Sequence, residues 1–317
     1  MSAKLKLKIA CDPFEFVRGM RDGSVSVDGI DLVFQPEMSN AKRHRAMVRE
    51  MAFDVCELNI GSYLIARDQG VPLTAIPVFL FRKFRHGNIF VRSGSGIRAP
   101  ADLIGRRVGC PTLQPASNVW LHGILESEHA LPHRSIHWVA EREEDLPFKA
   151  PSDLKIERLA QGQSALDLLL AGEIDALSCP QTPAPLINGD ERIARLFPDY
   201  LQRERDYYRR TGLFPIMHVT ALPNALVKRE PWIVGSLIAA FEQSKAMALA
   251  HFANTRVATL AWFGAQWEDE HRLLGADPWS YGLGETNRRN LETVVRYACQ
   301  QGLVQREMSL DELFTPG

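Results

Sequence analysis

The stretch MAFDVCEL, residues 51–58, follows a predicted helix and enters a short apolar strand with an aspartate at its start. A second stretch, AGEIDALSC at residues 171–179, follows an apolar helix at 165–170 and repeats this order of elements. Strand-like and helical segments alternate through most of the remaining chain, which favours an α/β fold with mainly parallel sheets. The two matching stretches therefore predict two lobes of similar build.

Polar residues stand where several predicted strands end. Asp12 follows the strand at 4–11, Glu57 lies at the end of the strand at 53–58, and Thr112 follows Cys110 in the same way. In open α/β sheets ligands bind beyond the carboxyl ends of the strands. Cysteines beside these residues read as small packed side chains. Their polar neighbours are the better candidates for a site.

A helix is predicted to start at Pro115, because proline suits the first helical turn. Thr112, Ser117 and Asn118 lie at or just before this start. Backbone N–H groups exposed at a helix N-terminus favour an anion such as a carboxylate. One polar residue would be enough for simple N-capping. Several together point to a ligand contact as the alternative.

Charge and composition exclude several classes of protein. The chain of 317 residues has 37 Lys and Arg against 38 Asp and Glu, a net charge of −1, so we expect neither nucleic acid nor an anionic membrane as partner. Leu5, Leu7 and Ile9 alternate as in a strand, unlike a signal peptide, and no stretch approaches 18 apolar residues. Five cysteines without a CxxC spacing fit a reducing compartment. We therefore expect a cytoplasmic protein.

Motifs of common cofactor and metal enzymes are absent from the sequence. It contains no HExxH, P-loop, GxGxxG or GxSxG pattern. Two histidines stand next to strand-like residues, His86 within residues 81–94 and His218 within residues 214–227. An isolated histidine is more often structural or solvated than catalytic. The residues around His86 and His218 therefore do not by themselves indicate a catalytic role.

The sequence shows a resemblance to the 4,5-dihydroxyphthalate decarboxylase family, which has the two-lobed fold of type II periplasmic binding proteins. The chain resembles this family over residues 53–303, in FDVCELNIGSYLIARDQG, FRHGNIFVRSGSGIRAPADLIGRRVG, PASNVWLHGIL, TGLFPIMHVTALPNAL and DPWSYGLGETNRRNLETVVRYACQQGL. FPIMHV and DPWSYGL are the most specific pieces. SGIRAPADLIGRRVG is common to many binding proteins of this fold, and the acidic, proline-containing segment 141–156 reads as a variable loop.

The resemblance implies a division of the chain. Lobe one would comprise residues 1–83 and 219–317, lobe two residues 84–218, with a ligand cleft between them. The segments bearing His86 and His218 would join the lobes, so both histidines are expected to face the cleft.

The resemblance also implies a reaction, the non-oxidative decarboxylation of 4,5-dihydroxyphthalate to 3,4-dihydroxybenzoate (protocatechuate) in phthalate degradation. His218 or His86 would donate the proton to the ring, since histidine exchanges protons near neutrality. Glu57 and Asp12 would accept from the hydroxyl groups. The carboxylates would be bound by arginines and by neutral donors, namely Arg18, Arg82, Arg85, Thr112, Ser117 and Asn118.

No organic cofactor is expected, because the hydroxylated ring can itself take up the electrons. A divalent metal is an alternative that the residues leave open, and His86, His218 and Glu57 would then be its ligands. The expected partner is a small aromatic dicarboxylate, and we expect a homo-oligomer.

Two other functions share this fold. A solute-binding protein would capture an aromatic or other carboxylate without reaction, and fold alone does not decide between binder and enzyme. The absence of an export signal favours the enzyme. The effector domain of a transcription regulator is disfavoured, because the chain starts with a strand and leaves no room for a helical DNA-binding module before it.

Overall fold

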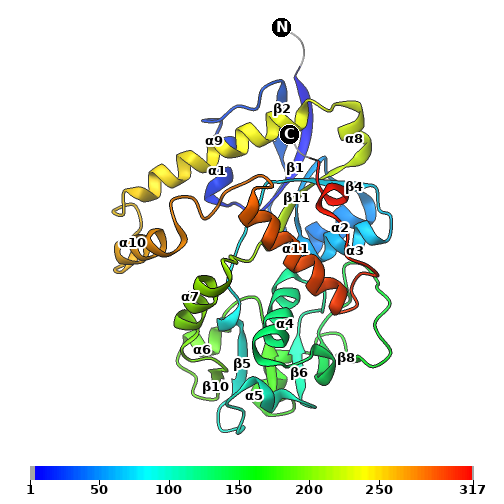
Figure 1. Cartoon of the computed structure of the whole chain (residues 1–317), viewed down its shortest axis with the longest axis vertical. Coiled ribbons are helices and arrows are strands. Elements are labelled where there is room, and N and C mark those ends of the chain that lie inside the picture. The colour runs from blue at the N-terminus through cyan, green and yellow to red at the C-terminus, as the bar shows by residue number, and fades with distance from the viewer. Residues whose placement is uncertain (1–3, 316–317) are drawn as a thin grey trace. The chain divides into compact units, whose positions relative to one another are not determined.

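The computed structural model describes residues 4–315 of the chain, which fold into two compact units. Unit 1 comprises residues 4–82, 216–291 and 308–315, and unit 2 comprises residues 83–215 and 292–307. Figure 1 shows their elements along the chain.

Unit 1 is built on a five-stranded sheet in the order β2-β1-β3-β11-β4. Its strands are β1 (Leu5–Ala10), β2 (Ile30–Phe34), β3 (Val55–Asn59), β4 (Leu73–Ile76) and β11 (His218–Pro223). β1 pairs in parallel with β2 and β3, whereas β11 runs antiparallel to β3 and β4. The chain enters β11 on its return from unit 2, which brings His218 into the sheet beside Asn59.

Helices complete unit 1. They are α1 (Glu15–Arg21), α2 (Asn40–Glu50), α3 (Ile60–Asp68), α8 (Asn224–Arg229), α9 (Ile233–Ala253), α10 (Phe263–Leu274), the first part of α11 (Glu285–Gln300) and α12 (Leu310–Leu313). Local sequence explains the abrupt change from β3 to α3, because Asn59 Oδ1 accepts hydrogen bonds from the N–H groups of Gly61 (2.9 Å) and Ser62 (3.2 Å). The strand can therefore end directly at a helix.

Unit 2 contains a six-stranded sheet in the order β10-β5-β9-β6-β7-β8. Its strands are β5 (Ile89–Arg92), β6 (Arg107–Cys110), β7 (His137–Ala140), β8 (Lys155–Arg158), β9 (Ala176–Ser178) and β10 (Ile193–Arg195). Its helices are α4 (Ala116–His129), α5 (Ala165–Ala171), α6 (Ala184–Ile187), α7 (Tyr200–Thr211) and the short 3-10 helices η1 (His86–Asn88), η2 (Pro100–Leu103) and η3 (His133–Ser135).

The predicted α/β fold with mainly parallel sheets is confirmed, and each sheet is mixed because one of its strands runs antiparallel to the others. In unit 2, β6 pairs in parallel with β7 and β9, and β7 with β8, but β5 runs antiparallel to both β9 and β10. In each unit the antiparallel strand, β11 or β5, follows directly where the chain enters from the other unit.

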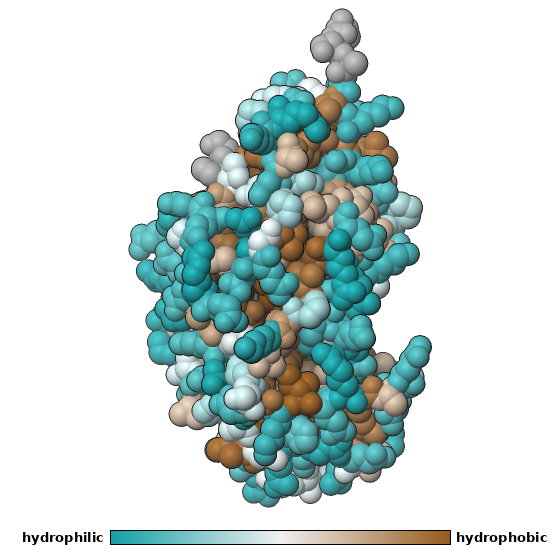
Figure 2. Space-filling model, turned by 90° about the vertical axis from the view of Figure 1, so that its right-hand side faces the viewer, coloured by the Kyte–Doolittle hydropathy of each residue, from teal (hydrophilic) through white to brown (hydrophobic). Residues whose placement is uncertain are grey.

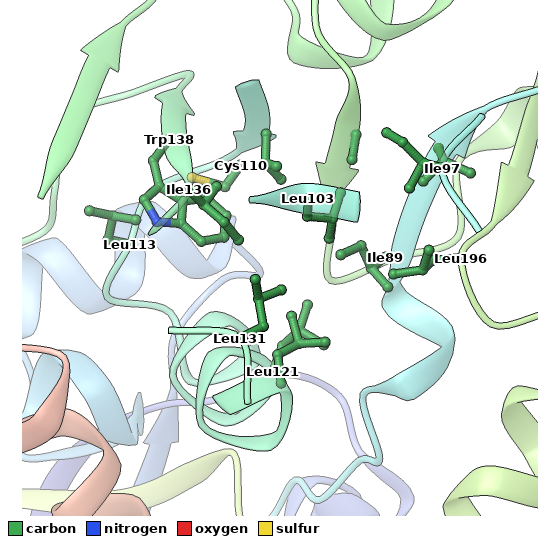
Figure 3. Close-up of a cluster of buried hydrophobic side chains, with 14 of the residues drawn as sticks. Ile89, Ile97, Leu103, Cys110, Leu113, Leu121, Leu131, Ile136, Trp138 and Leu196 are labelled. Atoms are coloured by element: carbon green, nitrogen blue, oxygen red, sulfur yellow. The ribbon is translucent and has the colours of Figure 1, made fainter. Parts of the chain in front are cut away.

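One hydrophobic cluster of unit 2 lies between its sheet and α4, and another lies between its sheet and α5. Figure 3 shows Trp138 and Cys110 from the sheet near Leu131 and Leu121 of the α4 region. Trp138 is fully buried and donates its indole N–H to the carbonyl oxygen of His133 (2.9 Å), so its one polar atom is satisfied.

Residues 292–307 are part of unit 2, although the expected division placed them in lobe one. The second part of α11 packs on α4, with the Tyr297 ring edge-on to Trp120 at 5.7 Å. A Cβ atom at Gly123 would lie only 2.1 Å from the Tyr297 ring, so glycine permits this contact. Gln301 then donates to the carbonyl oxygen of Val119 (2.8 Å). The sequence carried no sign that these residues pack on α4.

The sequence has no run of 18 apolar residues, but helix α9 is long and apolar enough to cross a membrane by length and composition alone. Its apolar face has a local explanation, because α9 packs on α1. Gly19 of α1 approaches so closely that a Cβ atom there would lie 3.2 Å from the Ser244 hydroxyl. Elsewhere hydrophilic side chains predominate on the face drawn in Figure 2, with apolar side chains in patches between them.

Candidate functional site

A buried cluster of charged side chains lies in unit 1, where β1 and β3 end and β11 begins. Glu57 of β3 is 1% exposed, and it meets His218, the first residue of β11. Asp12, just after β1, donates its backbone N–H to Glu57 Oε2 (2.7 Å). The structure thus brings together three of the residues predicted from the sequence.

Glu57 and His218 form a direct pair. The second carboxylate oxygen of Glu57, Oε1, contacts Nδ1 of His218. Among the residues that the structure describes, Nε2 of His218 has no hydrogen-bonding partner. A carboxylate at Nδ1 fixes the ring and leaves Nε2 as the atom for proton exchange.

Arg43 of α2 completes the cluster and was missed in the sequence. It is 1% exposed, and its guanidinium donates to Asp12 Oδ1 (2.6 Å), Glu57 Oε2 (2.9 Å) and Asn40 Oδ1 (2.9 Å). Its Nε also donates to the carbonyl oxygen of Glu57 (3.2 Å). One signal was present, because Arg43 shares a helix face with the buried Met47, and a buried arginine needs an anionic partner.

The charges of the cluster stabilise one another. Burial alone would raise the pKa of Glu57, but His218, Arg43 and the N–H of Asp12 outweigh it and lower that pKa below its usual value. Burial likewise disfavours the charged form of Arg43, yet Glu57 and Asp12 raise its pKa. Glu57 is therefore held as a carboxylate at neutral pH, ready to stabilise a positive charge on His218.

Aromatic rings surround the imidazole of His218. The Phe81 ring lies 5.1 Å from it, and the His44 ring of α2 lies edge-on at 5.4 Å. His44 is 4% exposed and, like Arg43, was not singled out from the sequence.

Two predicted carboxylate-binding arginines of unit 1 are used elsewhere. Arg18 is exposed on α1 and pairs with Glu15 (3.2 Å). Arg82 is buried and donates to the carbonyl oxygen of Ser280 (2.8 Å) and to Asn287 Oδ1 (2.7 Å). Its contacts hold the DPWSYGL segment, so the structure gives Arg82 a structural task.

Arg85 and His86 belong to unit 2 and are both buried. Burial lowers the pKa of Arg85 to about 10, and its guanidinium donates to the carbonyl oxygen of Pro180 (3.2 Å). The His86 ring lies 5.2 Å from Tyr207, and burial lowers the pKa of His86 to about 4. His86 is therefore neutral at pH 7, and the described residues place no carboxylate against it to orient its ring.

Thr112, Ser117 and Asn118 gather at the start of α4 in unit 2. Asn118 donates to the carbonyl oxygen of Thr112 and accepts from the Ser178 hydroxyl (2.6 Å), so both ends of its amide are engaged. No side chain caps α4. Within residues 4–315 the hydroxyl of Ser117 has no hydrogen-bonding partner, and that of Thr112 is buried without one. Asn118 thus holds the start of α4 in place through Thr112 and Ser178.

Of the residues considered as metal ligands, Glu57 and His218 belong to unit 1 and His86 belongs to unit 2. Among residues 4–315 no group of three or more His, Cys, Asp or Glu side chains is arranged to hold a metal ion. Glu57 and His218 instead bind each other.

Two curated proteins share extensive sequence with this chain. The 4,5-dihydroxyphthalate decarboxylase of Comamonas testosteroni is 36% identical over 99% of this chain and 97% of its own length. The 4,5-dihydroxyphthalate decarboxylase of Pseudomonas putida is 34% identical over 65% of this chain and 82% of its own length. A family model described as "NMT1/THI5 like" matches residues 26–140.

Solved structures show the fold. The alkanesulfonate-binding protein SsuA of Xanthomonas axonopodis pv. citri, bound to MOPS, matches with a TM-score of 0.60 at 14% identity, over 99% of both chains. The desulfurization enzyme DSZB matches with a TM-score of 0.53 at 15% identity, over 99% of this chain and 97% of its own. Binding proteins and an enzyme thus share this architecture, and the sequence relatives decide between them.

The fold and these relatives define a carboxy-lyase built on the periplasmic-binding-protein fold. The chain belongs to the 4,5-dihydroxyphthalate decarboxylase family. The resemblance seen in the sequence is confirmed.

Proposed function

We propose that this protein converts 4,5-dihydroxyphthalate to 3,4-dihydroxybenzoate and CO2, with His218 as the proton donor. The observation that carries the proposal is the buried Glu57–His218 pair, held by Arg43, in a chain 36% identical to an enzyme of that name. We place the reaction in phthalate degradation on the same ground. Location in the cytoplasm and a homo-oligomeric state remain predictions of the sequence.

The reaction needs a proton on the ring carbon that carries the leaving carboxylate. The hydroxyl para to this carbon supplies electron density, and Nε2–H of protonated His218 donates the proton. The carbon–carbon bond to the carboxylate then breaks, its electron pair restores the aromatic ring, and CO2 departs. His218 is left neutral and takes a new proton from solvent, so the proton balance is closed. The electrons stay within the substrate.

Glu57 and Arg43 prepare His218 for this step. Glu57 remains ionised because His218, Arg43 and the N–H of Asp12 together lower its pKa, Arg43 and Asp12 by binding Oε2. Its negative charge favours the imidazolium that must donate, and preorganised charges of this kind are usually the largest contribution to catalysis. Asp12 keeps one carboxylate oxygen on Arg43 and is partly exposed, which suits a role toward a substrate hydroxyl.

A panel of three substrates tests this assignment. Because the para hydroxyl supplies the electrons, 4,5-dihydroxyphthalate and 4-hydroxyphthalate should release CO2, whereas phthalate should bind without reacting. Chromatography of the products and trapping of CO2 measure both outcomes. Release of CO2 from phthalate at a comparable rate would contradict the proposed role of the hydroxyl group.

We propose that the reaction needs neither an organic cofactor nor a metal. Treatment with a chelator is then expected to leave kcat unchanged, measured before and after removal of the chelator. Loss of activity that a divalent ion restores would contradict this and would support metal-assisted catalysis instead.

We retain the start of α4 as the candidate for binding a substrate carboxylate. Replacing Ser117 by alanine should weaken phthalate binding about tenfold, because a hydrogen bond to a charged group is worth about 1.5 kcal/mol or more. Benzoate, with one carboxylate, should be affected less. Ser127→Ala at the far end of α4 is the matched control. Equal weakening of both ligands in calorimetry would argue against a contact specific to the dicarboxylate.

For the double replacement of Ser117 and Asn118 by alanine we expect the same preference, together with a lower melting temperature. Asn118 joins Thr112 to Ser178, so its loss removes structural hydrogen bonds as well. The single Ser117 variant therefore separates binding from folding.

A further inference from the structure

A row of four rings runs through the candidate site of unit 1. Phe14 stacks on Phe81 with centroids 5.9 Å apart and planes 20° apart. Phe81 in turn lies 5.1 Å from His218, and His218 lies 5.4 Å from His44. The row thus begins with two apolar rings and ends at the two histidines.

The two phenylalanines differ in burial from their neighbours. Phe16 and Phe79, two residues away from them in the sequence, are buried in the core. Phe14 and Phe81 are only partly buried, although they adjoin a cluster of buried charges. A partly exposed pair of stacked rings next to a polar centre resembles the lining of a ligand site, where apolar surface meets a few placed polar groups.

Backbone contacts hold both phenylalanines to the catalytic pair. The carbonyl oxygen of Phe81 accepts from the N–H groups of Met217 (2.9 Å) and His218 (3.3 Å). Phe14 donates its N–H to the carbonyl oxygen of Asp12 (2.8 Å), and the N–H of Asp12 binds Glu57. The backbones of both phenylalanines are therefore tied to the Glu57–His218 pair, and the Phe81 ring lies 5.1 Å from that of His218.

We propose that Phe14 and Phe81 form an aromatic platform that holds the ring of the substrate beside His218 and selects planar aromatic dicarboxylates over aliphatic ones. A substrate ring can add to the stack in an offset or edge-on arrangement, which is worth about 0.5–1.5 kcal/mol beyond the buried area. The platform favours a planar substrate ring, while His218 in the charged cluster supplies the proton. This inference rests on the proposed function for the identity of the substrate.

Two inert ligands test the platform by calorimetry, phthalate and its saturated counterpart cis-cyclohexane-1,2-dicarboxylate. Both carry two neighbouring carboxylates, but only phthalate has a planar aromatic ring. We expect the wild-type protein to bind phthalate more tightly. Phe81→Leu and Phe14→Leu should each weaken phthalate binding about 2- to 12-fold and change binding of the saturated ligand less than twofold.

Further variants separate stacking from general damage. Phe81→Tyr keeps the ring and should retain the preference for phthalate. Phe252→Leu replaces a partly buried phenylalanine of a separate aromatic group, beside Phe263, and should leave both affinities unchanged. Melting temperatures of all variants check that they fold. Equal weakening of both ligands in Phe81→Leu, or no weakening of either, would overturn the platform.

Decarboxylation provides an independent reading of the same variants. For Phe14→Leu we expect a higher KM and an unchanged kcat. This is the result when a substitution weakens binding of the ground state and of the transition state equally. If the wild-type protein releases no CO2 from 4,5-dihydroxyphthalate yet prefers phthalate, the proposed function fails and the platform stands. If it releases CO2 and shows no preference, the platform fails and the function stands.

Discussion

Replacing His218 by asparagine is expected to lower kcat for CO2 release by about 10²- to 10⁴-fold, the usual contribution of a positioned acid. Asparagine fills a similar space and can still bind Glu57, but it cannot donate a proton to carbon. Binding of phthalate should change little, because the proton transfer takes place only in the transition state. Steady-state kinetics and calorimetry on the same preparation separate these two effects.

His86→Phe is the control for this substitution. His86 is neutral and lies among aromatic side chains, so phenylalanine should keep its packing and most of the activity. Glu57→Gln should lower kcat as well, since the imidazolium then loses its counter-charge, and the pH dependence of kcat should change with it. A large loss in His86→Phe with little effect of His218→Asn would transfer the role of proton donor to His86.

Acid is expected to destabilise unit 2 through its buried histidines. Burial lowers the pKa of His133 to about 4, and it also lowers the pKa of His122, whose ring stacks on that of His133. An unfolded chain binds these protons near the usual pKa of about 6.5. Stability is therefore unaffected above that pH and falls as the pH drops from 6.5 toward 4, by about 3 kcal/mol for His133 over the whole range.

Other groups in unit 2 titrate in the same range, so a difference between variants is the cleaner measure. Burial raises the pKa of Glu204 to about 7, which favours the folded state as the pH falls and opposes the histidines. In His133→Phe the loss of unfolding free energy between pH 7 and pH 5 should be smaller than in the wild type by about 2 kcal/mol. Urea unfolding at both pH values tests this. The same pH dependence in both proteins would show that His133 is protonated in the folded state.

The sequence predicted the part of the site that depends on local pattern. Asp12 and Glu57 stood at predicted strand ends, and the structure places Asp12 after β1, Glu57 within β3 and His218 at the start of β11, which pairs with β3. Strand ends can be recognised from periodicity, and the ends of neighbouring strands meet at one edge of a sheet. The resemblance then supplied the reaction, which no spacing of residues could have shown.

The remaining part of the site depends on long-range contacts. Arg43 was one of several arginines in a predicted helix, and its role follows only from Glu57 and Asp12, which are distant in the sequence. The segment that bears His86 joins the units, but the His86 ring contacts Tyr207 and Phe197 of unit 2. Arg82 was expected to bind substrate and instead holds the segment around Ser280. The chemical type of a residue does not show which distant residues it will contact in the folded protein.

This chain is a decarboxylase, so it must do more than bind its ligand. The most direct measurement is the release of CO2 from carboxyl-labelled 4,5-dihydroxyphthalate by the purified wild-type protein. We expect many turnovers per protein molecule, with one CO2 released for each 3,4-dihydroxybenzoate formed. Tight binding of 4,5-dihydroxyphthalate with no CO2 released over hours would contradict this expectation and would leave a binding protein in place of an enzyme.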